Sequence, residues 1–278
     1  MATTGAACGL PRRRKGFIMQ PVFRRCDRVI DRVAARMMRG KYSSVFRSIH
    51  IILFLALAAP GTIAVAAEPE DAGMKHRVAA CSACHSPEGI QMEAGYVPRI
   101  RGKPAGYLYN QLVNYQQRRR RNRSMNHMVA HLSHAYLFEI AQYFADQRTP
   151  YPAPAAQPPA ALAQRGRQLV REGDADADVP ACAGCHGQRL TGVQPNTPGL
   201  VGLPRQYIMG QLGAWQVGTR HAAAPDCMAH IAGRLQGGDI AAVAAWLAAQ
   251  PVPNNTRPAR EPIDEPPLAC GSVPKPEP

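Results

Sequence analysis

Two five-residue segments, Cys81–His85 and Cys182–His186, constrain this chain most, because each reads Cys-x-x-Cys-His. This spacing lets one tight turn present two thiols to the vinyl groups of a porphyrin while the next imidazole reaches the iron. A structural zinc site would need further thiolate or imidazole ligands, and a thioredoxin-like dithiol needs no fused histidine. The sequence therefore predicts two covalently bound haem c groups. Their thioether bonds are predicted at Cys81, Cys84, Cys182 and Cys185, and the proximal iron ligands at His85 and His186.

The two segments belong to an internal repeat, which selects candidates for the second axial ligand of each iron. At an offset of 103 residues, Met125 aligns with Met228 and His127 aligns with His230. A methionine thioether is the usual distal ligand where an iron transfers electrons at a raised potential, since soft sulfur favours ferrous iron. We therefore predict Met125 and Met228 as the distal ligands. The aligned histidines are the alternative, which would give two imidazoles per iron and a lower potential.

The basic excess of the chain is concentrated before the repeat. The formal net charge is +14, but residues 1–67 hold 12 Lys and Arg against 2 Asp and Glu, which leaves 21 against 17 for the remainder. The apolar run Ile49–Ala59 and the small residues before Glu68 are typical of a secretory signal peptide cleaved after Ala67, with an uncleaved anchor as the alternative. The mature chain is thus close to neutral, and with no nucleic-acid motif it is not expected to bind nucleic acid.

Composition divides the chain into five segments. Proline-rich stretches flank the second haem unit, and the first unit follows the basic leader. The predicted segments are a leader and signal peptide at 1–67, a first haem domain at 68–149, a linker at 150–160, a second haem domain at 161–250, and a tail at 251–278 that is draped over the second domain.

Helical periodicity dominates both haem units, and strand signals are scarce, so we expect an all-α fold. The predicted helices span Met74–Ala80, Tyr107–Gln117, Tyr136–Asp146, Ala161–Glu172, Tyr207–Gln216 and Asp239–Ala249. The acidic segment Asp174–Asp178 has no counterpart in the first unit and is predicted to be a surface loop.

Two further features lie outside the haem motifs. The run Arg118–Arg121, followed by Arg123, is either a solvated face, a neutralising partner for a haem propionate, or a docking site for an acidic protein. Cys227 and Cys270 remain after the four haem cysteines and the two of the leader. In an oxidising compartment a disulfide between them is predicted, which would tie the tail beside the second haem.

The order of motifs resembles the dihaem cytochrome c4 family of class I c-type cytochromes. The residues that carry the resemblance follow each haem motif and are Pro98–Gly102 and Tyr107–Leu112 in the first unit and Pro198–Gly202 and Tyr207–Leu212 in the second. The resemblance implies two tandem class I cytochrome c domains related by pseudo-twofold symmetry, with haems approaching through their propionate edges. It also implies that the Pro98 and Pro198 carbonyls accept a hydrogen bond from the proximal imidazoles.

From the paired ligands and this resemblance we expect an electron carrier of the bacterial periplasm rather than an enzyme. It would accept electrons from a quinol-oxidising complex or a dehydrogenase and pass them to a terminal oxidase, with peripheral membrane association left open. The alternatives are a dihaem enzyme of the peroxidase or thiosulfate dehydrogenase type, and a cytochrome subunit of a membrane-bound dehydrogenase.

Overall fold

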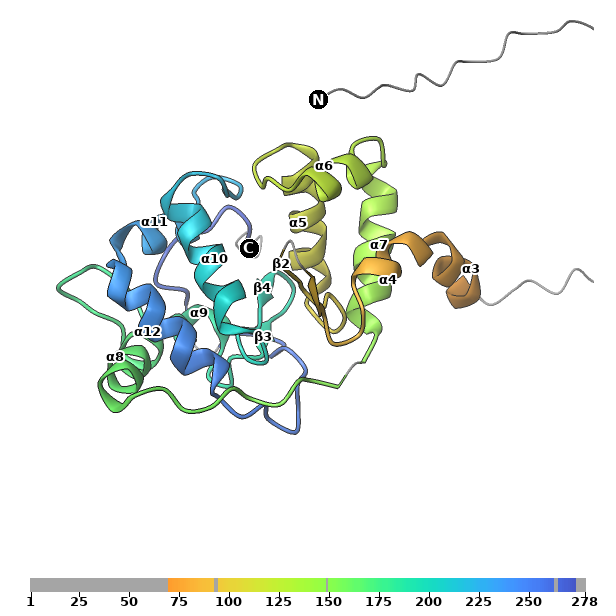
Figure 1. The fold of residues 1–278 in the computed structure, drawn as a ribbon. Helices are drawn as coiled ribbons and strands as arrows, with labels where there is room; N and C mark the ends of the chain where they lie inside the picture. The colour runs from red at the N-terminus through yellow and green to blue at the C-terminus, as the bar shows by residue number, and fades with distance from the viewer. Residues whose placement is uncertain (1–69, 93–94, 149, 263–264, 274–278) are drawn as a thin grey trace, which may run out of the picture. The chain divides into compact units, whose positions relative to one another are not determined.

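The computed structural model describes residues 70–92, 95–148, 150–262 and 265–273, and the ribbon in Figure 1 shows that nearly all of the regular structure is helical. The predicted leader and signal peptide lie outside the described residues. Among those that are described, no helix is long and apolar enough to span a membrane. The two halves that contain the haem motifs belong to one compact unit.

The first half begins with helices α3 (Glu70–Arg77) and α4 (Ala79–Cys84), which lead into the first haem motif. A short antiparallel hairpin, β1 (Ile90–Met92) and β2 (Gly95–Val97), follows the motif. Next come α5 (Ala105–Gln116), α6 (Arg123–Val129) and α7 (His134–Asp146). Figure 1 shows α5 beside α7, and their apolar faces bury a core of Val78, Leu108, Ile140, Ala141 and Phe144.

The second half repeats this order. Its elements are α8 (Ala160–Arg171), α9 (Cys182–His186), β3 (Gly192–Val193), β4 (Thr197–Pro198), α10 (Arg205–Gln216), α11 (Cys227–Arg234) and α12 (Gly237–Ala248). Helix α12 packs closely on α8, because Gly166 leaves no side chain between the two backbones. The core here is larger than in the first half, with Trp246, Leu247 and Leu169 at its centre.

The six predicted helices are present, with ends shifted by a few residues. The first predicted helix differs most, because the helical backbone is interrupted at Val78, which separates α3 from α4. Three short helices, α6, α9 and α11, were not predicted. A polar cap begins both α6 and α11, since the Asn122 side chain accepts a hydrogen bond from the Met125 amide and Asp226 accepts one from the Ala229 amide.

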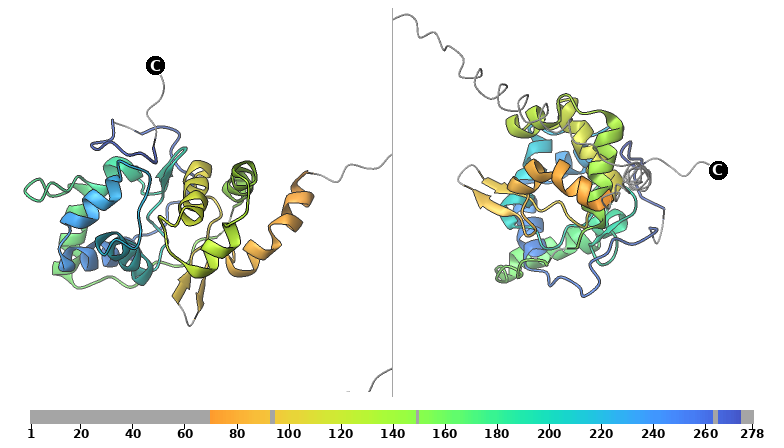
Figure 2. Two further views of the ribbon diagram at one scale, coloured as in Figure 1. Left: turned by 90° about the horizontal axis from the view of Figure 1, so that it is seen from above. Right: turned by 90° about the vertical axis from the view of Figure 1, so that its right-hand side faces the viewer.

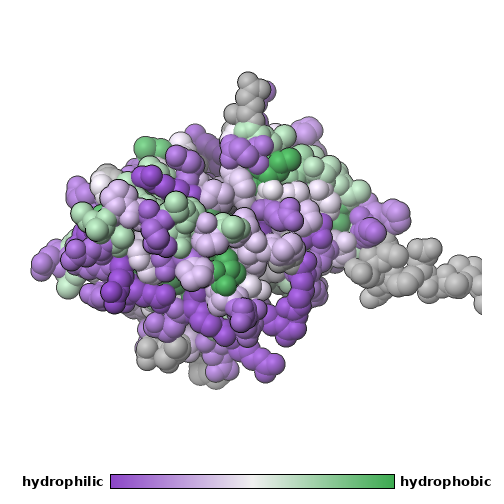
Figure 3. All heavy atoms as spheres, turned by 60° about the horizontal axis from the view of Figure 1, so that its bottom comes forward, coloured by the Kyte–Doolittle hydropathy of each residue, from purple (hydrophilic) through white to green (hydrophobic). Residues whose placement is uncertain are grey.

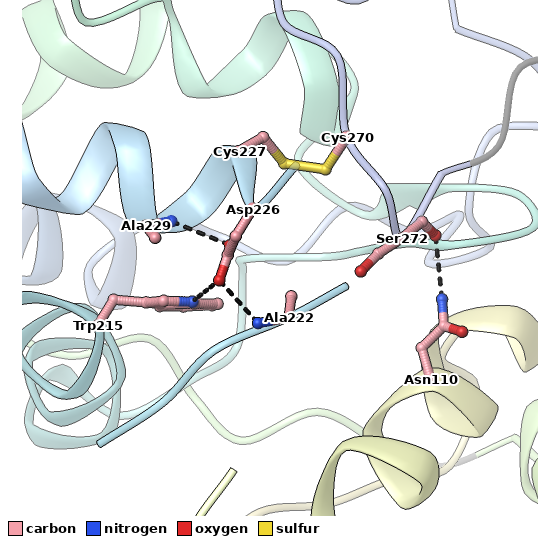
Figure 4. Close-up of a disulfide and its surroundings, with 8 residues drawn as sticks. All are labelled: Asn110, Trp215, Ala222, Asp226, Cys227, Ala229, Cys270 and Ser272. Atoms are coloured by element: carbon pink, nitrogen blue, oxygen red, sulfur yellow. Dashed lines mark hydrogen bonds between the residues drawn. A yellow bond between two sulfur atoms is a disulfide. The ribbon is translucent and has the colours of Figure 1, made fainter. Parts of the chain in front are cut away.

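The described part of the tail, residues 251–262 and 265–273, runs along the second half without helix or strand, as predicted, and it is held there by specific contacts (Figure 2). The Ala259 amide donates to the Gly192 carbonyl and the Ala259 carbonyl accepts from the Gln194 amide, both at 2.8 Å. Farther on, Cys270 is joined to Cys227 at the start of α11 by a disulfide, so the predicted pairing is confirmed (Figure 4). The tail then reaches the first half, where the Asn110 amide nitrogen donates to the Ser272 carbonyl at 3.0 Å.

The acidic segment Asp174–Asp178 is a loop, as predicted, and ion pairs hold it against the neighbouring helices. Arg165 binds both Asp174, at 2.8 Å, and Asp239 of α12, at 2.7 Å. Asp178 pairs with Arg234 at 3.0 Å. The loop therefore links α8 to α11, and Arg165 also joins α8 to α12.

Two candidate haem centres

The two haem motifs give their histidines equivalent hydrogen-bond partners. The Nδ1 atom of His85 lies 2.7 Å from the Pro98 carbonyl oxygen, and Nδ1 of His186 lies 2.7 Å from that of Pro198. A carbonyl can only accept, so Nδ1 of each ring carries the proton and Nε2 keeps its lone pair for a metal. The hydrogen bonds implied by the resemblance are thus confirmed.

Burial also favours the neutral form of both rings. It lowers the pKa of His85 and of His186 below the ordinary value, and the bond to the proline carbonyl opposes this only in part. His186 is the more deeply placed, with 8 % of its surface exposed, whereas His85 is half-buried. Neutral imidazole is the form that binds iron.

The surroundings of the four motif cysteines suit an uncharged sulfur. Burial raises the pKa of Cys182 to about 12 and raises the pKa of Cys81 and Cys185 as well. Thiolate binding to zinc would be opposed by this burial, whereas a thioether carries no charge. In addition, the described residues contain no cluster of three or more His, Cys, Asp or Glu suited to a metal ion. The residues therefore fit covalent haem better than zinc.

The predicted distal methionines occupy equivalent helices. Met125 lies in α6 and packs against Val113 and Val129, while Met228 lies in α11 and packs against the core of the second half. Their histidine rivals are placed differently. His127 is exposed, and Nε2 of His230 lies 3.2 Å from the Asp178 carboxylate. These positions favour the methionines, and iron coordination by either pair stays a prediction.

Sequence reasoning missed a role for the aligned glutamines at the ends of α5 and α10. The Gln116 amide donates to the Val129 and Leu132 carbonyls at 3.0 and 2.8 Å. Gln216 makes the same pair of bonds to Ala232 and Leu235, at 3.0 and 2.7 Å. Each glutamine thus fixes the end of the helix that carries the methionine. The repeat had aligned the two residues, but only their contacts reveal this function.

Several c-type cytochromes are similar to this chain in sequence. No protein-family model matches the chain. It is 37% identical over 198 residues to a protein of Thiomonas intermedia named thiosulfate dehydrogenase electron acceptor, a match that covers 71% of this chain and 91% of that protein. It is 32% identical over 199 residues to cytochrome c4 of Pseudomonas aeruginosa, covering 71% of this chain and 96% of that one. The chain belongs to the cytochrome c4 family.

Solved structures agree with this assignment. Reduced cytochrome c4 from Pseudomonas stutzeri superposes with a TM-score of 0.52 at 27% identity, over 64% of this chain and 97% of that one. The thiosulfate dehydrogenase TsdBA of Marichromatium purpuratum gives a TM-score of 0.54 at 30% identity, over 62% of this chain and 36% of that one. The chain is therefore an all-α dihaem protein with two tandem class I cytochrome c domains, and as a cytochrome c4 it carries two covalently bound haem c groups.

Proposed function

We propose that this dihaem electron carrier works in the periplasm, where it takes electrons from a thiosulfate-oxidising dehydrogenase and delivers them to a terminal oxidase. The observation that carries the proposal is the equivalence of the two centres, each with an imidazole held at 2.7 Å from a proline carbonyl and a methionine on a short capped helix. When bound, each haem c supplies a one-electron couple. Two centres of this kind leave no ligand position for a substrate.

The proposal assigns one role to each site residue and keeps the predicted division of the chain. Cys81, Cys84, Cys182 and Cys185 form the thioethers; His85 and His186 bind iron through Nε2, and the Met125 and Met228 sulfurs bind the opposite side. The segments are the leader at 1–67, cytochrome domains at 68–149 and 161–250, a linker at 150–160 and a tail at 251–278.

Two observations support the choice of donor and compartment. Relatives in Thiomonas intermedia and Stutzerimonas stutzeri, at 37% and 33% identity, are named electron acceptors of thiosulfate dehydrogenase. The Cys227–Cys270 disulfide fits an oxidising compartment. A quinol-oxidising complex stays the alternative donor.

Docking of the donor is assigned to exposed arginines that follow α5. Arg118, Arg121 and Arg123 are exposed, so they are available to an acidic partner. The face drawn in Figure 3 is mainly hydrophilic, with hydrophobic side chains scattered in small groups. Charge steering by these arginines would give fast, reversible association with an acidic partner.

A second candidate function follows from the likeness to TsdBA, of which this chain matches 36%. The chain would then be the electron-transfer part of a dehydrogenase assembly rather than a diffusing carrier. Size measurement of the native complex separates the two, because a permanent subunit would elute with its enzyme at every protein concentration.

Carbon monoxide binding to the reduced holoprotein tests the carrier assignment. Carbon monoxide needs an open position on ferrous iron, so two capped irons should give no difference spectrum. A spectrum that corresponds to one haem would show an open centre and would favour the enzyme alternative.

Electron transfer tests the donor. Stopped-flow mixing with a purified thiosulfate dehydrogenase and thiosulfate should reduce both haems, and replacement of Arg118, Arg121 and Arg123 by Gln should slow this about tenfold at low salt only. The matched control replaces three exposed arginines elsewhere, Arg148, Arg167 and Arg205, by Gln. Equal rates for both triple variants would contradict the docking assignment, and no reduction of the native protein would contradict the donor.

A further inference from the structure

Two buried arginines meet where the halves of the molecule contact each other. Arg120 follows α5 and Arg220 follows α10, and they occupy equivalent positions in the repeat at an offset of 100 residues. Their backbones form an antiparallel bridge, and the His221 amide donates to the Arg119 carbonyl. Only 8 % of Arg120 and 6 % of Arg220 is exposed. Arg120 therefore differs from its exposed neighbours in the basic run and is not part of a solvated face.

The two guanidinium groups share the same neutral acceptors across the halves. Arg120 donates to Gln111 of its own half at 3.0 Å and to Gln211 of the other half at 2.6 Å. Arg220 donates to Gln211 at 2.6 Å and to Gln111 at 3.2 Å. Each amide oxygen thus receives hydrogen bonds from both arginines. Aromatic rings cover the groups, with Trp215 3.7 Å from Arg220 and Tyr115 4.8 Å from Arg120.

Positive charge accumulates at this contact between the halves. The ion pairs found among the described residues involve neither arginine. Burial and then the charge of Arg120 lower the pKa of Arg220 to about 10. Tyrosines and glutamines line the cluster, and these are neutral at physiological pH.

Such a cluster lowers the stability of the folded protein unless an anion binds to it. Burial of an unpaired charge costs several kcal/mol, and two like charges in one site add repulsion. The cofactors of this protein bring suitable anions, because each haem carries two propionate carboxylates. Guanidinium groups suit carboxylates, since their N–H donors match the two oxygens. The neutral glutamines would then orient the guanidinium groups rather than neutralise them.

We propose that Arg120 and Arg220 form one cationic site that binds propionates of both haems, so that a charge supplied by one half sets the potential of the haem in the other half as well. The inference rests on the two haem sites of the proposed function and adds a residue set that neither motif contains. Because each arginine hydrogen-bonds to both halves, the site is shared by the two haems.

The sign of the effect follows from charge. A cation near an iron disfavours the ferric state, so its removal should lower the midpoint potential. A propionate that loses its arginine also has a higher pKa, which should move its protonation toward neutral pH. Loss of either arginine is therefore expected to lower both potentials and to increase their dependence on pH.

The test compares Arg120→Gln and Arg220→Gln with Arg167→Gln, which removes the same charge from an exposed position outside the cluster and outside the docking arginines. Potentiometric titration from mildly acidic to mildly alkaline pH, with the haem methyl signals in NMR to distinguish the two centres, should show both potentials lowered in each buried variant and nearly unchanged in the control. Shifts confined to the haem of the mutated half, or no shift beyond that of the control, would overturn the shared site.

Two further measurements keep this result interpretable. Arg120→Lys retains the charge and should restore most of the potential of both haems, which covers the case in which the Gln variant folds poorly. The sulfur-to-iron charge-transfer band of the ferric protein reports methionine ligation. If the variants keep this band, methionine ligation is intact whether or not the arginines bind propionates. If the native protein lacks the band, the assignment of methionine as axial ligand is wrong, and the propionate site is not affected by that result.

Discussion

The two halves of this molecule share a repeat but differ in how they protect their centres. In the first half α4 has no buried residue and Cys84 is exposed, whereas in the second half Ala183 and His186 of α9 are buried. The second half also has the larger core, the Arg165 ion pairs and the tail with its disulfide. The residues shared by both halves thus fix the positions of the ligands. The residues found in one half only determine how rigid each centre is and how far it is shielded from solvent.

Removal of a distal methionine should have the largest effect, and it tests whether the centres are chemically equal. Met125→Ala or Met228→Ala should open one iron, so reduced protein should bind carbon monoxide at about half of its haem. Met128→Ala is the control, because this neighbour is 45% exposed. If His127→Ala opens the first iron and Met125→Ala does not, the methionine assignment is wrong.

Removal of the disulfide should weaken the second half selectively. The bond closes a segment of 43 residues, and loss of such a constraint costs about 2–4 kcal/mol. Denaturant unfolding of Cys227→Ser with Cys270→Ser, followed through each haem, should show an earlier transition for the second centre. A reducing agent should have the same effect on the native protein and none on the double variant.

Close packing of α8 on α12 can be broken by one methyl group. A Cβ at Gly166 would lie 2.3 Å from the Ala242 carbonyl oxygen, so Gly166→Ala should destabilise the second half by about 1–3 kcal/mol. Gly73 in α3 of the first half has no atom within 4 Å of an added Cβ. Gly73→Ala should therefore stabilise its helix slightly, and thermal unfolding of both variants would reveal the opposite signs.

Acid should affect the second half first, although this effect is the smallest. Hydrogen bonds from Arg165 lower the pKa of Asp174 and of Asp239. A lowered folded pKa contributes stability that is complete above the ordinary value near 3.8 and is lost as the pH falls through the lowered one. Arg165→Gln should flatten this acid dependence. Arg77→Gln, which breaks an exposed pair with Glu139, should leave it unchanged.

Much of the site and fold could be predicted because it depends on local pattern. The haem motifs need a fixed spacing, and helices such as α5, α7 and α12 show their apolar faces in the sequence. By contrast, α6 and α11 are too short for periodicity and depend on the caps Asn122 and Asp226. The burial of Arg120 could not be read from a basic run, since it results from contact with Gln211 ninety-one residues away.

The Cys227–Cys270 bond places opposite demands on one maturation pathway. Four thiols of this chain must be kept reduced until each has added to a vinyl group, while two others must be oxidised to one another in the same compartment. A premature bond between Cys182 and Cys185 would block attachment of the second haem. Because Cys270 follows both haem motifs in the sequence, its bond to Cys227 cannot form before both motifs have been synthesised. Attachment of both haems can therefore precede closure of the tail.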